Sequence, residues 1–546
     1  MNTFSDLKEN RYLQMILLIA LLMVQTVNIV FWGTKKENLY WDEYFTLERA
    51  HYISDSTPFE HYIDADMDYK IEEWIPVSLV YDSLIVKREE SVLMDSPYSV
   101  LVKVLGYHNY SLFLNLFEAI LSPGKLSIWP AIILNIVFFL INQILLYCLC
   151  KRISDNVVFP YATVALYGFS SMCLSMAIFL RFYMLATMLT TLFIYMHLVY
   201  FQTKGKHHLK RIFLLVISFA ALYIGYKNAQ FMLIYGALFV FSFSLLLLIK
   251  KGLKSFLIYA VPIYGGGVLY LATQTEYLKI FTDYDKALAD AGNALAWCLE
   301  QIAGFTIDML PDRLNDMKFI LGKYLFGSYY LMVALLLLTV MMIVVRRLLL
   351  KDKTIATNSD GFAIAIAIST ILYLLFFTVF GLYEQVRYLS FVFTMLAVIV
   401  VIIAFDIFVN NKVKYVGMVL VLVLMICSVN LKGKVDMLYS GDRETIMRVR
   451  NLDQDSFLLH ADRHRTAISY QVSLLADPQD EFYVYDGTAD GAIETLESQL
   501  RSEMILVTRL GVPADDVIDF LTQKGYVVDE VGNLYNFVVY NAKNSK

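Results

Sequence analysis

The chain has 546 residues, of which 58% are hydrophobic and only 17% are charged, and its mean hydropathy is +0.56. This composition excludes an ordinary soluble multidomain protein, which would carry more charge and fewer apolar runs. The net charge of −5 also argues against a nucleic-acid-binding protein.

Apolar runs of about twenty residues without charge predict helices that cross a bilayer. The first run is too long for the apolar part of a signal peptide, and no small-residue cleavage site follows it, so we expect a retained span. The fold class predicted is a polytopic α-helical membrane protein with eleven spans. They are expected at residues 12–32, 128–150, 157–179, 182–201, 212–226, 229–249, 256–273, 323–345, 361–381, 388–409 and 415–430.

Basic residues beside the spans predict the orientation, because cytoplasmic loops are enriched in Lys and Arg. Alternate connections carry them, for example Lys151 with Arg152, Lys250 with Lys251, and Lys412. We therefore expect a cytoplasmic N-terminus and, with an odd number of spans, an extracytoplasmic C-terminal segment.

The first external loop, residues 33–127, contains the stretch NLYWDEYFTL at residues 38–47. Asp42 and Glu43 stand there among aromatic residues about ten residues beyond the first span. Carboxylates are costly in the hydrocarbon core but inexpensive at the interface, and aromatic side chains favour an interfacial belt. The pattern from Trp41 to Tyr52 is compatible with a helix. An acidic pair at a helix start is the alternative, since the helix dipole favours acids there.

A second acidic cluster in this loop, HYIDADMDYKIEEW, contains Asp64, Asp66 and Asp68. Alternating aspartates can bind a hard cation such as Mg²⁺ or Mn²⁺ through carboxylate oxygens. A solvated loop face is the alternative, and the glycine and distal glutamate of a calcium-binding loop are absent.

The sequence predicts two domains, a transmembrane domain over 1–435 and a small extracytoplasmic α/β domain over 436–546. Apolar runs at 457–460, 482–485 and 504–507 predict strands, with helices at 464–475, 489–502 and 513–524 between and after them. Strand–helix alternation indicates a short, mainly parallel sheet. The final segment, YVVDEVGNLYNFVVY, predicts a hairpin that turns at Gly532-Asn533.

Three motifs resemble one family. An aromatic-flanked W-D-E-x-[YF]-T after the first span is similar to the first external loop of GT-C glycosyltransferases, in the branch of the protein O-mannosyltransferases and the lipid A aminoarabinose transferase. The stretch LRFYMLATMLTTLFIYMHLVYF from Leu180 resembles the Arg-x-Tyr-x-Leu opening of a span in that branch, and EQVRYLSFVFTM resembles its Arg-Tyr entry into a late span. The plan of a long first external loop, many spans and an external C-terminal domain agrees.

The resemblance implies a polyprenyl-phosphate-linked sugar donor and transfer to an extracytoplasmic acceptor hydroxyl on a lipid, glycan, teichoic acid or protein of the cell envelope. It implies Asp42 as the general base of an inverting displacement, with Glu43 in support. The leaving phosphate needs positive charge rather than a protein acid. The residues expected to contact it are Arg181, Tyr183, Lys227, Arg387 and Tyr388. The alternative for Arg181, Lys227 and Arg387 is an ordinary interfacial anchor, whose charged group reaches water at the end of a span.

Two other functions remain open. A transporter or flippase for envelope lipids or glycans would generally carry ionisable residues near the middle of its spans, whereas the charges here gather at span ends. A non-catalytic membrane scaffold would present the external domain to partners and would not need Asp42, Arg181 and Arg387 on one side.

Overall fold

The computed structural model describes residues 10–53, 73–106, 109–203, 207–273, 300–334, 337, 361–407, parts of 423–430, 435–461, 465–486, 493, 496–510 and 514–545. The chain forms two compact units, each assembled from separate stretches of sequence. The membrane unit comprises Met1–Asn28, Val137–Ala177 and Phe182–Val435, and the sheet unit comprises Ile29–Ile136, Ile178–Arg181 and Asp436–Lys546. The first external loop and the C-terminal segment Asp436–Lys546, called the tail below, therefore contribute to the same unit.

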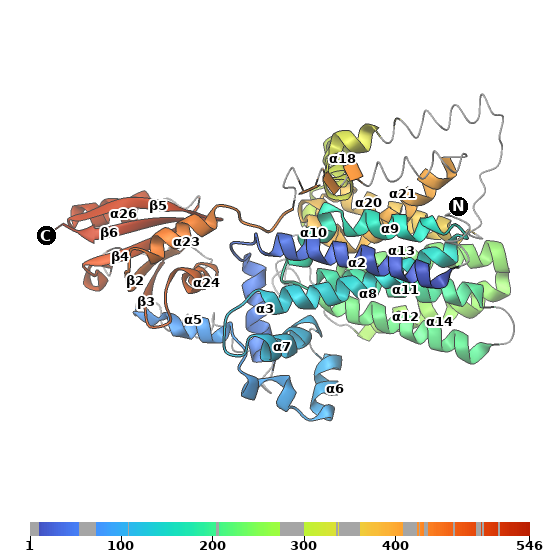
Figure 1. Ribbon diagram of the computed structural model, residues 1–546, viewed down its shortest axis with the longest axis horizontal. Coiled ribbons are helices and arrows are strands. Elements are labelled where there is room, and N and C mark those ends of the chain that lie inside the picture. The colour runs from blue at the N-terminus through green and yellow to red at the C-terminus, as the bar shows by residue number, and fades with distance from the viewer. Residues whose placement is uncertain are drawn as a thin grey trace. The chain divides into compact units, whose positions relative to one another are not determined.

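The long apolar runs form helices because a helix satisfies its backbone hydrogen bonds internally, as a lipid environment requires. The helices of these runs are α2 (Arg11–Gly33), α8 (Trp129–Ile153), α9 (Val158–Gly168), α10 (Ser171–Ile178), α11 (Tyr183–Gln202), α12 (His208–Asn228), α13 (Phe231–Lys251), α14 (Leu253–Thr273), α20 (Phe362–Val379) and α21 (Phe393–Ile407), the last preceded by the 3-10 helix η5 (Val386–Val392) (Figure 1). In the membrane unit α11 packs on α12 and η5, and α13 packs on α14 and α20.

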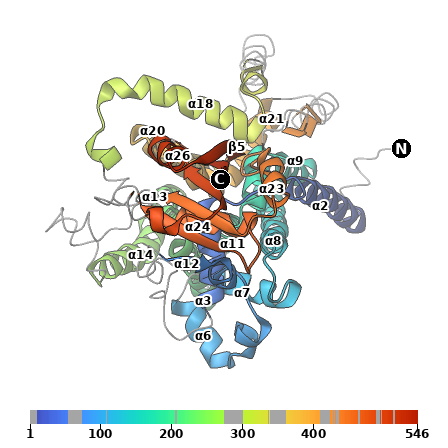
Figure 2. The same cartoon turned by 90° about the vertical axis from the view of Figure 1, so that its left-hand side faces the viewer.

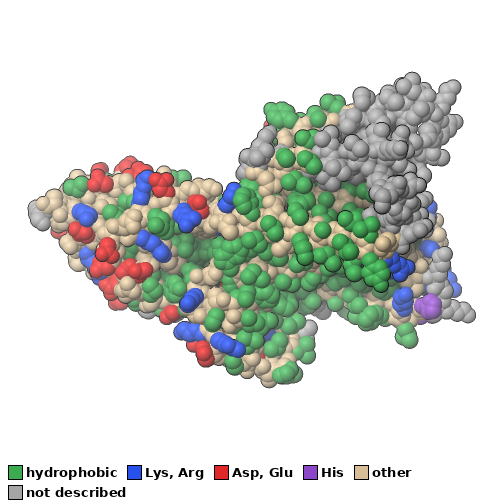
Figure 3. Space-filling model, in the orientation of Figure 1, with side chains coloured by type: hydrophobic (Ala, Val, Ile, Leu, Met, Phe, Trp, Pro, Cys, Tyr) green, Lys and Arg blue, Asp and Glu red, His purple; other side chains and the backbone are tan. Residues whose placement is uncertain are grey.

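Among the described residues, seven helices are long and apolar enough to cross a membrane, or eight if the bent pair α9 and α10 is one span. Apolar side chains cover much of the membrane unit's surface on the face in view in Figure 3, whereas acidic and basic side chains are scattered over the strands and helices of the tail. These helices make the chain an integral membrane protein, as the sequence predicts. The predicted span at 415–430 lies mostly outside the described residues.

Two predicted spans differ from the structure. Residues 157–179 are not one straight helix, because α9 and α10 are bent by 57° at their junction. Ser170 starts the second helix by accepting a hydrogen bond from the Cys173 amide at 3.2 Å. The span expected at 323–345 does not begin there either, because α18 (Leu310–Phe326) ends at Gly327, whose φ of 68° is left-handed. A new helix starts at residue 329 and is described as far as residue 334.

The tail and one short strand of the first external loop form a six-stranded sheet in the order β1-β3-β2-β4-β6-β5. Its strands are β1 (Ile75–Pro76), β2 (Ser456–Ala461), β3 (Glu481–Asp486), β4 (Glu503–Arg509), β5 (Tyr526–Leu534) and β6 (Phe537–Asn544). The three strands predicted from apolar runs are confirmed as β2, β3 and β4, which pair in parallel. The sheet is mixed rather than mainly parallel, because β1, β5 and β6 pair antiparallel with their neighbours. Strand β1 comes from the first external loop.

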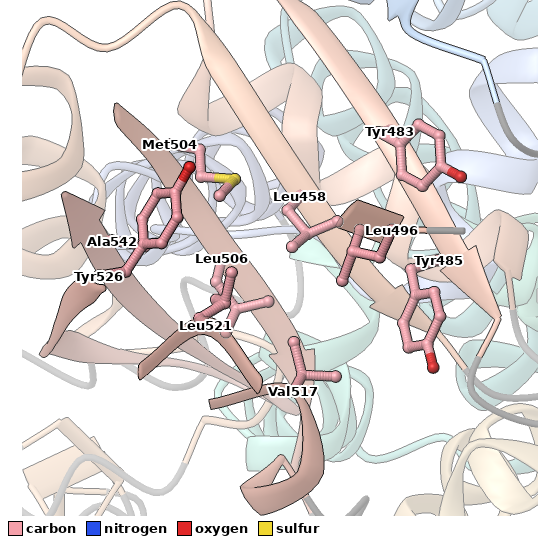
Figure 4. Close-up of a cluster of buried hydrophobic side chains, with 10 residues drawn as sticks. All are labelled: Leu458, Tyr483, Tyr485, Leu496, Met504, Leu506, Val517, Leu521, Tyr526 and Ala542. Atoms are coloured by element: carbon pink, nitrogen blue, oxygen red, sulfur yellow. The ribbon is translucent and has the colours of Figure 1, made fainter. Parts of the chain in front are cut away.

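Three helices pack around these strands, α23 (Asp442–Arg450), α24 (Arg465–Leu475) and α26 (Asp515–Gln523) (Figure 2). The last two confirm the predicted helices at 464–475 and 513–524. Of the helix expected at 489–502, residues 489–492, 494 and 495 lie outside the described residues. In the described remainder, Glu497–Gln499 form the short 3-10 helix η6 and residues 500–502 are not helical. Alternate strand residues and α26 build one buried cluster (Figure 4). Its members are Leu458, Tyr483, Tyr485, Leu496, Met504, Leu506, Val517, Leu521, Tyr526 and Ala542.

The predicted hairpin exists as β5 and β6, but its turn is not at Gly532-Asn533. Those two residues still belong to β5, and the two-residue turn is Tyr535-Asn536. Gly532 instead lies at a β-bulge, where a Cβ atom would come within 2.6 Å of the Thr445 hydroxyl. Glycine is needed there for close approach to α23 and not for chain reversal.

Candidate functional site

The stretch that contains Asp42 and Glu43 forms helix α3, Trp41–Tyr52, as predicted. Glu43 stands in the first turn, and its Oε2 accepts a hydrogen bond of 2.6 Å from the Tyr40 amide. This contact satisfies one amide that the helix start leaves without an intrahelical partner, and the negative charge favours the same end of the helix dipole. The acidic pair is therefore part of the reason that a helix starts here.

Asp42 and Arg181 lie together in the sheet unit. The Nη2 atom of Arg181 is 3.9 Å from Oδ2 of Asp42, and the two side chains are 13% and 27% exposed. Nη1 of Arg181 donates to the Asp42 carbonyl at 2.8 Å and to Oγ1 of Thr46 at 3.0 Å. The guanidinium thus grips the first turn of α3 and presents its charge beside a carboxylate that solvent reaches.

Glu43 has the opposite environment. Its side chain and that of Lys36 are both fully buried, and Nζ of Lys36 lies 3.0 Å from Oε2 of Glu43. The other carboxylate oxygen, Oε1, accepts the Leu180 amide at 2.8 Å. Three donors, the Lys36 ammonium and the amides of Tyr40 and Leu180, therefore converge on one carboxylate. This suits the supporting role predicted for Glu43 better than contact with a substrate.

Burial raises the pKa of the Glu43 carboxyl, and the Lys36 charge and the amides of Leu180 and Tyr40 oppose that rise. Burial likewise lowers the pKa of the Lys36 ammonium, against the attraction of Glu43. A buried pair remains charged only when its geometry is good and further hydrogen bonds are made, and both conditions hold here. We therefore treat the two as an ion pair.

Sequence reasoning missed Lys36 and the residues that support the Arg181 segment. Asn135 donates to the Phe179 carbonyl at 2.7 Å, and its Oδ1 accepts the Tyr110 hydroxyl at 3.1 Å. Lys36 resembles any cation just after a span, and Asn135 any polar residue within one. Nothing in their spacing indicates that they meet near Glu43 and Arg181.

Tyr44 of the motif is a core residue, whereas Tyr40, Trp41 and Phe45 are half-buried. Tyr44 is fully buried, and its ring stacks on Tyr470 of α24 with centroids 5.3 Å apart. Phe45 meets the same ring edge-on at 5.6 Å. The interfacial interpretation is wrong for Tyr44, because the tail rather than lipid supplies its apolar surroundings; for Tyr40, Trp41 and Phe45 it stays a prediction.

The other predicted phosphate contacts belong to the membrane unit. Tyr183 is the buried first residue of α11, and its ring lies 4.7 Å from that of Phe182. The Tyr388 ring lies 4.3 Å from that of Phe231, which begins α13, and Arg387 lies over the Tyr388 ring at 5.6 Å.

Lys227 stands in the last turn of α12, a few residues before Phe231. The α12–α13 connection is thus beside η5, so Lys227, Arg387 and Tyr388 share one end of the membrane unit. Their contact with a donor phosphate stays a prediction.

An apolar groove of about 820 Å³ runs along α12, α13 and α14 in the same unit. Tyr223 and Tyr226 line it from the last turns of α12, and Leu233 from the first turn of α13. On α14 the wall includes Gly266 and Gly267, where an added Cβ would meet nothing within 4 Å. The groove therefore lies beside the half of these helices that ends at the Lys227 connection, and its walls suit a hydrocarbon chain.

The acidic cluster Asp64, Asp66 and Asp68, predicted as a metal site, lies outside the described residues. Within the residues that are described, no group of three or more His, Cys, Asp or Glu side chains is arranged to hold a metal ion. Metal binding at these aspartates stays a prediction.

Comparisons with known proteins give one kind of match. No protein-family model matches the chain, and no curated protein matches it. Among solved structures it is similar to ArnT from Cupriavidus metallidurans bound to undecaprenyl phosphate, with 11% identity, coverage of 97% of this chain and 98% of that chain, and a TM-score of 0.46. It is also similar to ArnT from Cupriavidus metallidurans in the apo state, with 11% identity, coverage of 96% of this chain and 97% of that chain, and a TM-score of 0.46.

Proposed function

We propose that this protein is a membrane glycosyltransferase that moves a sugar from a polyprenyl-phosphate donor to an acceptor hydroxyl on the extracytoplasmic side. The observation that carries the proposal is the pairing of Asp42 with Arg181, which are 139 residues apart in sequence. A solvent-reached carboxylate beside a guanidinium is what this transfer requires, because one group accepts a proton while the other attracts a phosphate.

In the proposed reaction the acceptor oxygen attacks the anomeric carbon, and its proton passes to the Asp42 carboxylate. The bond between the anomeric carbon and the phosphate oxygen breaks, and polyprenyl phosphate leaves as an anion. Attack opposite the leaving group inverts the anomeric configuration. Arg181 holds Asp42 in place and offers positive charge to the phosphate, while Glu43 fixes the start of α3 from within the protein.

The apolar groove supports a lipid-linked donor, since a polyprenyl chain needs an extended apolar seat within the bilayer. Its walls come from helices of the membrane unit that expose apolar side chains to lipid. A soluble nucleotide sugar would have no use for such a groove.

The test compares envelope glycans and glycolipids, by mass spectrometry, in cells that lack the protein and cells complemented with variants. Asp42→Asn keeps the shape of the side chain but removes the base, so we expect product to fall about 100-fold or more. A polyprenyl-linked sugar precursor should accumulate, as in cells without the protein.

The matched control is Asp82→Asn, which alters an exposed carboxylate on α5 (Val77–Ser83) in the same unit and should restore the product. Asp42→Asn protein that is present in the membrane at the wild-type amount and restores wild-type product would refute the assignment. Unchanged envelope chemistry in cells without the protein would refute the function itself.

A further inference from the structure

Lys36 joins the start of α3 to the segment that leads into the tail. Besides its contact with Glu43, Nζ donates to the Met437 carbonyl at 2.8 Å and lies 5.1 Å from the centre of the Tyr439 ring. Met437 and Tyr439 belong to the segment that leads into the tail, and both have positive φ values, 65° and 54°. Non-glycine residues adopt that conformation only where surrounding contacts hold them in it.

The two residues after Lys36 also form hydrogen bonds with the beginning of the tail. The Glu37 amide donates to the Leu438 carbonyl at 2.8 Å, and Oε2 of Glu37 accepts the Gly441 amide at 2.7 Å. Asn38 donates to Asp442 at 2.6 Å and to Gln471 at 3.2 Å. Residues 36–38 are therefore attached to the beginning of the tail at three consecutive positions.

The second carboxylate oxygen of Glu43 connects Lys36 with the Asp42–Arg181 pair. This oxygen, Oε1, holds the Leu180 amide, and the next residue, Arg181, grips Asp42 and Thr46. A continuous series of contacts thus runs from the Met437 carbonyl through Lys36, Glu43 and Leu180 to the Asp42–Arg181 pair. Shifts of about 1 Å in a reacting group can cost about 100-fold in rate, so this series is positioned to control the chemistry.

We infer that Lys36 is a positioning residue that, through Glu43, makes the placement of Asp42 and Arg181 depend on the docked tail. The inference rests on the proposed function for its effect on transfer, but the contacts themselves can be tested without it. It assigns the tail a role in catalysis that is separate from any contact with the acceptor.

The experiment uses the full chain with three variants: Lys36→Met, the double variant Lys36→Met with Glu43→Gln, and Tyr526→Phe. The last removes a hydrogen bond of 2.7 Å to the Arg501 carbonyl inside the tail and does not touch α3. The measurements are the Tm, the rate of envelope product formation in complemented cells, and hydrogen exchange of peptides that contain the Tyr40 and Leu180 amides.

Lys36→Met should lower the Tm, because it leaves the Glu43 charge buried without its cation, and should slow product formation about 10- to 100-fold. The double variant removes the buried charge, so its Tm should recover. Its product formation should remain slow, and exchange at Tyr40 and Leu180 should remain faster than in the wild type. Tyr526→Phe should lower the Tm without changing the rate or the exchange of either peptide.

Recovery of both the Tm and the rate in the double variant would overturn the inference, because Lys36 would then only neutralise Glu43. Unchanged exchange at Tyr40 and Leu180 in Lys36→Met would overturn it as well. If the wild type forms no glycan product, the proposed function fails, and the exchange and Tm measurements still decide whether Lys36 orders the site.

Discussion

Two buried glutamates of the sheet unit illustrate how environment decides the state of a carboxyl group. Glu48 of α3 is fully buried and accepts the Tyr470 hydroxyl at 2.6 Å. Glu118 of α7 (Asn109–Leu121) is only 4% exposed, and within the described part of the chain neither of its carboxyl oxygens has a hydrogen-bond partner. Burial raises the pKa of Glu118 well above its ordinary 4.5, so the neutral acid is the favoured form.

This raised pKa makes stability depend on pH. In the unfolded chain Glu118 loses its proton near pH 4.5, whereas in the folded chain it keeps it to a higher pH. The folded state therefore binds more protons in that window, and stability falls as pH rises through it. We expect Glu118→Gln, which cannot ionise, to remove this loss. The Tm difference between the variant and the wild type should grow from pH 5 to pH 8.

Thermal unfolding of the detergent-solubilised full chain at several pH values measures this difference. Asp82→Asn, at an exposed carboxylate of the same unit, is the control and should give a difference that does not change with pH. A constant difference for Glu118→Gln would show that the carboxyl group is not desolvated in the folded protein.

At the scale of elements, α9 ends just before its bend into α10 at a glycine, Gly168, that packs against two buried amides. A Cβ atom at Gly168 would come within 2.3 Å of the side-chain nitrogens of both Gln25 and Gln143. Gln25 donates to the Val164 carbonyl at 3.0 Å, and Gln143 donates to Gln25 at 3.2 Å. The small residue and the amide network are thus required together.

Gly168→Ala should force these amides apart and destabilise the protein by about 1–3 kcal/mol through overpacking and lost hydrogen bonds. The matched control is Gly265→Ala in α14, where a Cβ would meet nothing within 4 Å. In a helix interior that change should be neutral or stabilise by up to about 1 kcal/mol. Thermal unfolding of both full-length variants checks the contrast, and equal Tm values would contradict it.

At the scale of the whole molecule, the charges beside the spans predict that the tail is extracytoplasmic and that the α13–α14 connection is cytoplasmic. A membrane-impermeant thiol reagent should therefore label Ser545→Cys in intact cells, and Lys254→Cys only after permeabilisation. The native Cys298 is first replaced by Ser. Labelling of Lys254→Cys in intact cells, or protection of Ser545→Cys, would reverse the orientation and place Asp42 on the cytoplasmic side.

Features that depend on a local pattern were predictable from the amino-acid sequence alone. Long apolar runs specify membrane helices, apolar clusters specified β2, β3 and β4, and the acidic first turn specified the start of α3. The sequence also pointed to Asp42 and Arg181 through short motifs. Such signals lie within one segment, so no knowledge of distant partners is needed to find them.

The contacts between distant segments became known from the folded chain and not from any local pattern. The tertiary structure paired β1 of the first loop with the tail, moved the hairpin turn to Tyr535-Asn536, and buried Tyr44 against Tyr470. It also brought Lys36 into contact with Glu43 and Met437, and no sequence pattern predicts these two contacts. A lysine after a span looks the same whether it faces lipid headgroups or a buried carboxylate, because its state depends on partners up to 401 residues away.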